Sequence, residues 1–240
     1  MIRVAAAFAL YTAGVHLFAG QKRVVAPMEQ ASFSAFARST LFVVWHITSF
    51  LLVTIALVLA WFGDAIDPLL RLVLAAQAGF AALLFLARGQ RAHGGGFPLP
   101  QWILLGPLAL AIAVPRFAAP FVLLALAVVH VAWVFGVAWP SPSTRVAPTF
   151  VIGWPESSRL PSAPATLTVA ATLVGMAAVT LHGPRWAALA IAAVLGLRGV
   201  YGPFERWIRP SIVETPYRVL SAAFYSPLCL FLAALIVARA

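Results

Sequence analysis

The chain alternates long apolar stretches with short punctuation by proline, glycine and charged residues. Several stretches contain about 18 residues or more, the length that crosses a hydrocarbon core of about 30 Å as an α-helix. The pattern predicts eight such helices, at residues 3–20, 41–62, 68–88, 99–114, 119–139, 164–182, 184–200 and 216–238. The fourth contains Pro107 and is expected to be a kinked helix, because neighbouring helices can satisfy the carbonyl that proline leaves free.

Composition indicates that these helices lie in a membrane. Of the 240 residues, 63% are hydrophobic and 9% are charged, against about 45–50% and about 25% in soluble domains. A water-soluble fold of this size could not bury so much apolar surface. The predicted fold is therefore an all-α integral membrane protein of eight transmembrane helices, with the lipid bilayer as its partner. We expect the first helix to be retained, because Lys22-Arg23 follows it instead of a small-residue cleavage site.

The positive charge predicts an orientation. The net charge is +10, but the cations are scattered singly between apolar runs, so we expect no nucleic-acid partner. With eight crossings, one face and its helix ends hold 11 cations: Lys22, Arg23, Arg38, Arg88, Arg91, Arg145, Arg159, Arg198, Arg206, Arg209 and Arg218. The other face holds 5: Arg3, Arg71, Arg116, Arg185 and Arg239. The positive-inside rule then predicts termini on the non-cytoplasmic face and a cytoplasmic loop from Trp139 to Ala163.

The two halves of the chain resemble each other. His16 and His130 each lie late in an apolar helix, and an Arg-Gly pair ends both the third and the seventh predicted helix. From the histidine to a matching proline, Pro107 or Pro227, is 91 residues in the first half and 97 in the second. This order predicts two parallel four-helix repeats about a pseudo-twofold axis along the membrane normal. The expected units are residues 1–116 and 117–240.

The histidines are the main candidates for chemistry. His16, His46 and His130 are each placed near the cytoplasmic end of an apolar helix, and imidazole suits both metal binding and proton transfer. Arg198, late in an apolar helix, is expected to face protein or a water-filled cavity. One interpretation is a cytoplasm-facing cavity between the repeats, lined by these four residues under the loop that carries Glu156. Such a cavity would bind or transport a small or lipid-soluble ligand.

Two other functions remain open at this stage. The same histidines could serve a membrane enzyme or redox protein as metal or haem ligands or as acid/base groups, or the chain could be a non-catalytic subunit or scaffold. The histidines could also simply pack near helix ends, and Arg198 could reach the headgroups. No His-x-x-x-His or Glu-x-x-His pairing fixes a metal geometry, so no metal site, cofactor or catalytic residue is assigned. Glu205 and Glu214 lie among arginines, where interfacial ion pairing is expected.

The second half resembles an uncharacterised family of small four-helix bacterial membrane proteins with a C-terminal Tyr-Ser-Pro-Leu-Cys-Leu signature. The matching segments are Val137-Ala138-Trp139-Pro140, Leu197-Arg198-Gly199-Val200-Tyr201-Gly202-Pro203-Phe204, Glu214-Thr215-Pro216 and Phe224-Tyr225-Ser226-Pro227-Leu228-Cys229-Leu230. The resemblance covers about residues 119–238, and the family's usual acidic residue is replaced near position 202. It implies a bacterial cytoplasmic (inner) membrane location and a four-helix unit, but no reaction.

Overall fold

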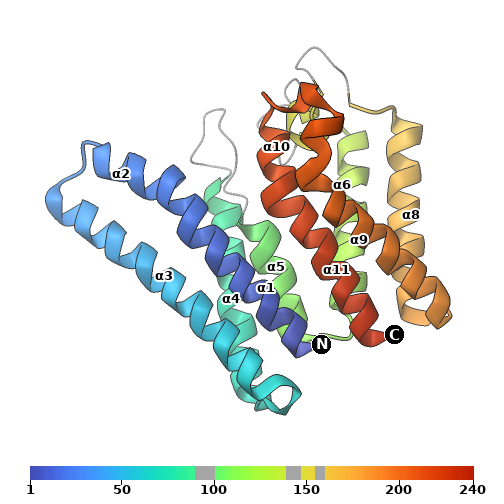
Figure 1. The fold of residues 1–240 in the computed structure, drawn as a ribbon, viewed down its shortest axis with the longest axis horizontal. Helices are drawn as coiled ribbons and strands as arrows, with labels where there is room; N and C mark the ends of the chain where they lie inside the picture. Colours follow the sequence, from blue (N-terminus) through green and yellow to red (C-terminus); the bar gives the residue numbers. More distant parts are fainter. Residues whose placement is uncertain (90–100, 139–146, 155–159) are drawn as a thin grey trace.

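The computed structural model describes residues 1–89, 101–138, 147–154 and 160–240, and within them it is helical without strands (Figure 1). The main helices are α1 (Ile2–Gly14), α3 (Ala35–Phe62), α4 (Pro68–Gly89), α5 (Trp102–Ala113), α6 (Ala118–Val134), α8 (Ala163–His182), α9 (Arg185–Ile208) and α11 (Ser226–Arg239). Short helices α2 (Ala26–Gln30), α7 (Ala147–Val151) and α10 (Pro216–Leu220) lie between them. Both termini lie at the same end of the bundle (Figure 1).

Within the described residues each predicted stretch contains a helix, which confirms the all-α class. Six helical segments of the described chain are long and apolar enough to cross a membrane: Ile2–Ala19, Ala35–Ala65, Pro68–Phe85, Ala163–His182, Arg185–Ile208 and Pro216–Arg239. Helices α5 and α6 are shorter, with 12 and 17 residues. The predicted end of the seventh helix at residue 200 was wrong. Helix α9 continues through Gly202 and Pro203 to Ile208, since proline inside a packed apolar helix need not break it.

Helix ends follow the capping chemistry of the sequence. The Ser34 hydroxyl accepts a hydrogen bond from the Ala37 N–H at 3.2 Å, and α3 therefore begins at residue 35 instead of the predicted 41. Gly63 ends the same helix with φ of 55°, a conformation that favours glycine. The Asp67 carboxylate accepts from the Leu69 N–H at 2.9 Å and caps α4.

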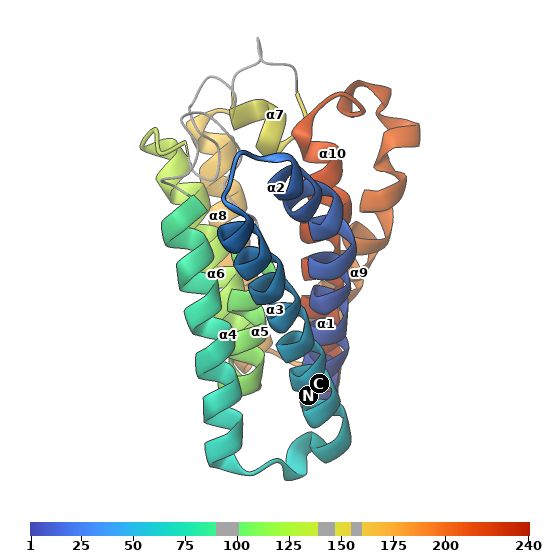
Figure 2. The same ribbon diagram turned by 90° about the vertical axis from the view of Figure 1, so that its left-hand side faces the viewer.

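Helix pairing repeats between the two halves. In the first half α1 packs on α3 and α4 packs on α5, while in the second half α6 packs on α8 and α9 packs on α11. The halves meet where α1 contacts α11 and α5 contacts α6, and α1–α5 and α6–α11 contacts complete a central group of four helices (Figures 1 and 2). Helices α3, α4, α8 and α9 therefore lie outside this group.

The core is built from the central helices. Leu108 and Ile112 of α5, Leu123 of α6 and Leu232 of α11 are at most 1% exposed. The outer helices instead expose large apolar side chains, such as Trp61 at 84%. In water such continuous apolar faces would promote aggregation, whereas in a bilayer they contact the hydrocarbon of the lipid. The distribution agrees with the membrane location expected from composition.

Helices α9 and α11 pack closely through two glycines. A Cβ atom built on Gly199 would lie 2.6 Å from Leu230 Cγ and 2.9 Å from the Ser226 carbonyl oxygen. A Cβ on Gly202 would overlap the Ser226 hydroxyl. Because small residues let two helix backbones approach, these glycines set the distance between α9 and α11.

Candidate functional site

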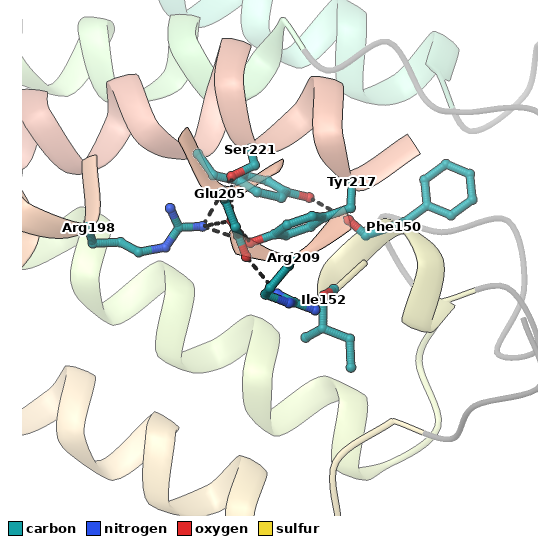
Figure 3. A network of polar contacts seen from close by, with 8 residues as sticks. Phe150, Ile152, Arg198, Glu205, Arg209, Tyr217 and Ser221 are labelled. Carbon is teal, nitrogen blue, oxygen red and sulfur yellow. Dashed lines mark hydrogen bonds and ion pairs between the residues drawn. The ribbon is translucent and has the colours of Figure 1, made fainter. Parts of the chain in front are cut away.

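A buried carboxylate organises the second half of the molecule (Figure 3). Glu205, on α9, is 3% exposed, and its Oε1 accepts a hydrogen bond from Arg209 Nη1 at 2.6 Å. Its Oε2 accepts from the Tyr217 hydroxyl at 3.0 Å and from Ser221 Oγ at 3.3 Å. Both oxygens are therefore engaged, by donors from the residue that follows α9, from α10 and from the π-helical turn Ser221–Tyr225 that joins α10 to α11.

Arg198 is the second cation of this network. Its Nη2 lies 3.7 Å from Glu205 Oε2 and donates hydrogen bonds to the Tyr217 hydroxyl at 2.8 Å and to Ser221 Oγ at 3.3 Å. Two guanidinium groups thus surround one carboxylate, which leaves the network with a net charge of about +1. The side chains of Arg198 and Arg209 are 34% and 32% exposed, against 4% for Glu205, so the cations reach outward while the anion stays inside.

The network also holds the segment that contains α7 (Figure 3). Arg209 Nη2 donates to the Ile152 carbonyl at 3.0 Å, and the Tyr225 hydroxyl donates to the Phe150 carbonyl at 3.5 Å. Gly153, with φ of 70°, brings the backbone close to Tyr217. This arrangement ties the α7 segment, α9, α10 and the turn before α11 together. It is suited to a structural role, because both carboxylate oxygens already accept hydrogen bonds from the protein.

The expected ion pairing of Glu205 is confirmed, and the structure adds that the paired carboxylate is buried within the protein. Glu205 lies on the same buried face of α9 as Ala192, Leu195, Gly199 and Gly202. The spacing of three and four residues in this series follows helical periodicity. Had the helix been extended past residue 200, the sequence would have placed this carboxylate among buried positions. Glu214, by contrast, is exposed.

A second polar centre lies in the first half, around His16. The His16 ring is 5% exposed, stacks on Trp45 with ring centroids 3.9 Å apart, and places Nδ1 3.0 Å from Ser49 Oγ. The Ser49 hydroxyl donates to the Trp45 carbonyl at 3.2 Å. Since that hydroxyl has one proton, the network assigns the His16 proton to Nδ1 and leaves Nε2 as an acceptor.

His16 lines a cavity of about 220 Å³ between α1, α3, α4 and α5. The wall is largely apolar, with Leu52, Ile55, Leu104 and Leu105 among its residues. The polar residues on it are Thr12, His16, Thr48, Gln77 and Gln101. The Oε1 atom of Gln101 is buried and has no hydrogen-bond partner among the described residues. The cavity thus combines apolar walls with the polar side chains of His16 and Gln101.

The other described residues predicted for the site, His46, His130 and Arg198, do not line the His16 cavity. His46 packs edge-on against Phe42, with ring centroids 4.3 Å apart. His130, on α6, uses Nδ1 on the Leu126 carbonyl of its own helix at 2.8 Å and contacts Trp133. Glu156 lies outside the described residues, so a site shared by all five stays a prediction.

The described residues contain no group of three histidine, cysteine, aspartate or glutamate side chains arranged for a metal ion. Glu205 is surrounded by cations, and His16 has Ser49 and Trp45 as neighbours. The residues in these two centres are therefore suited to hydrogen bonding and ion pairing.

Comparison with known families gives one match. Residues 123–236 contain a domain of a family of proteins of unknown function, DUF3995, which covers just under half of the chain. The position agrees with the resemblance expected over residues 119–238, while the Tyr-Ser-Pro-Leu-Cys-Leu signature and the four-helix arrangement stay predictions. No curated protein and no solved structure matches the chain. The Glu205 network lies inside the matched domain, and the His16 cavity lies outside it.

Proposed function

We propose that the first half of this membrane protein binds a small, mostly apolar molecule that carries a hydrogen-bond donor. The observation that carries the proposal is the 220 Å³ cavity with apolar walls and the polar side chains of His16 and Gln101. Ligand sites in proteins typically combine such walls with a few polar groups that orient the ligand. This position differs from the predicted cavity between the two repeats. All of the described residues that line the His16 cavity come from the first half.

Size and polarity define the class of ligand. An apolar cavity of about 150 Å³ holds a benzene ring, so a substituted six-membered ring fits the volume at His16. A hydroxyl or N–H group on that ring would donate to His16 Nε2. An unpaired buried acceptor costs about 1–3 kcal/mol, which a donor on the ligand would recover.

The surroundings favour a ligand that arrives through the lipid. Leu51 of α3 and Phe80 of α4 both line the cavity and are 45% and 65% exposed on the outer surface of the bundle. Since α3 and α4 lie outside the central helices, an apolar molecule dissolved in hydrocarbon could pass between these side chains. A lipid-soluble ligand is therefore the simplest occupant.

The ligand proposal predicts a preference for a donor in matched probes. The protein in lipid nanodiscs should bind phenol about fivefold to tenfold more tightly than toluene, because only phenol donates a hydrogen bond. His16→Phe should abolish this preference and His130→Phe should preserve it, as measured by ligand-observed NMR titration. Equal binding of the two probes to the unmodified protein, or an unchanged preference in His16→Phe, would refute the proposal.

We propose further that the chain crosses the membrane eight times as two parallel repeats, in a bacterial cytoplasmic membrane with both termini outside. The contacts α1–α3, α4–α5, α6–α8 and α9–α11 support the repeat, because each half pairs its first helix with its second and its third with its fourth. The central contacts α1–α11 and α5–α6 are those a pseudo-twofold axis would relate. The 11 to 5 distribution of cations supports the orientation.

Fusion reporters test this topology. Alkaline phosphatase fused after Ala240 should be active, because the C-terminus is proposed to lie outside, and green fluorescent protein at the same position should be dark. Fusions after Gly89, at the end of the third proposed crossing, should give the opposite pair of signals. A fluorescent fusion after Ala240 would contradict the orientation.

A further inference from the structure

A cavity in the second half, at the end of the bundle where the termini lie, is lined by three arginines. Its volume is about 190 Å³, and its wall includes Arg116 before α6, Arg185 at the start of α9 and Arg239 at the end of α11. The end of α8, at Thr180 and Leu181, completes this wall. The cavity is separate from the His16 cavity and from the Glu205 network, since it shares no lining residue with either.

None of the three guanidinium groups forms an ion pair with a carboxylate side chain of the described residues. Both ion pairs formed by described residues involve Glu205. Arg239 donates from Nη1 to the Thr180 carbonyl at 2.6 Å and from Nη2 to the Leu181 carbonyl at 3.1 Å. Arg116 and Arg185 form no hydrogen bond with the described residues, and Arg116 lies close enough to Arg239 for their charges to repel. An anion between them would relieve this repulsion.

The depth of the cavity matches that of a phosphate group at the membrane surface. Segment Ala163–His182 ends at this cavity, segment Arg185–Ile208 begins there and segment Pro216–Arg239 ends there. The ends of apolar spans lie at the level of the lipid headgroups. Arginine presents paired donors that fit two oxygens of a phosphate, so three arginines on the wall of one cavity favour a phosphate as its occupant.

We propose that Arg116, Arg185 and Arg239 form a binding site for a phosphate group at this end of the second half. The phosphate is supplied either by an anionic phospholipid headgroup or by a soluble phosphate. The hydrogen bonds from Arg239 to the Thr180 and Leu181 carbonyls fix its guanidinium at the end of α8. Arg116 and Arg185 supply the N–H donors that bind the phosphate. The site does not depend on the ligand proposed for the His16 cavity.

Thermal unfolding of the full chain in a neutral detergent tests the site in two arms. The lipid arm compares short-chain phosphatidylglycerol with phosphatidylcholine, and the soluble arm compares inorganic phosphate with chloride at equal ionic strength. At least one anionic phosphate ligand should raise the Tm above its comparison. Stabilisation in the lipid arm alone assigns a headgroup, and stabilisation in the soluble arm assigns phosphate itself as a ligand.

Variants make the test specific. Arg116→Gln with Arg185→Gln should weaken the binding of that ligand about tenfold or more, because two charge-assisted donors are lost. The matched control, Arg3→Gln with Arg71→Gln, removes the same charge from the first half and should leave binding unchanged. Arg116→Lys with Arg185→Lys keeps the charge and should bind with intermediate affinity. No stabilisation in either arm, or an equal loss in the control, would overturn the proposal.

Discussion

Replacing Glu205 by alanine is expected to destabilise the protein by about 3 kcal/mol, the lower end of the range for breaking a buried ion pair. The side chain is 3% exposed and its two oxygens accept from Arg209, Tyr217 and Ser221. Without the carboxylate, Arg198 and Arg209 would face each other as like charges. Because each is about one-third exposed, solvent would screen part of this repulsion.

A short series of variants separates charge from shape at this position. Glu205→Gln keeps the size of the side chain and should lose less stability than Glu205→Ala. Combining Glu205→Gln with Arg209→Gln should recover part of the loss, because the uncompensated cation is removed as well. Unfolding of the purified protein in detergent, followed by tryptophan fluorescence, measures each change.

Glu214→Gln provides the matched control for this series. Glu214 is exposed in the connection between α9 and α10, and the same chemical change there should alter stability by no more than about 0.5 kcal/mol. If Glu205→Ala were as stable as Glu214→Gln, the buried network would not hold the second half together. The proposed structural role of Glu205 would then be wrong.

The all-helical class of the fold was predictable because the length of an apolar stretch determines where a helix can form. Each predicted stretch contains a helix within the described residues, and the errors lie at ends such as residue 200, where Gly202 and Pro203 suggested a stop. These residues break helices in water, but a packed apolar helix tolerates them. Gly202 is needed because Ser226 of α11 lies against it. That contact between α9 and α11 cannot be predicted from the local sequence.

The candidate sites were less predictable, for a physical reason. Helices that are apolar on all sides show no moment that identifies the face turned towards protein. The depth of His16 could be inferred from its position, but its contacts with Trp45 and Ser49 depend on how α1 and α3 are rotated. The same uncertainty hid the three-arginine cavity, whose members lie at the ends of different helices.

Because α9 packs on α11, replacing glycine by alanine is expected to stabilise the protein at one position of α9 and to destabilise it at another. Alanine normally stabilises a helix over glycine by about 0.5–1 kcal/mol. Gly196 should follow this rule, because its added Cβ would lie 3.9 Å from the Ala233 Cβ, an ordinary contact. At Gly199, the next turn of the same face, the added Cβ meets Leu230 and the Ser226 carbonyl oxygen at less than 3.0 Å.

Gly199→Ala is therefore expected to destabilise the protein by about 1–3 kcal/mol, and Gly199→Val by at least as much, because the backbone of α11 would have to move. Gly196→Ala, and Gly175→Ala on α8 where nothing lies within 4 Å of the new Cβ, should be neutral or stabilising. Unfolding midpoints of the four variants in detergent give the comparison. If Gly199→Ala stabilised as much as Gly196→Ala, helices α9 and α11 would be farther apart than the contact at Gly199 requires.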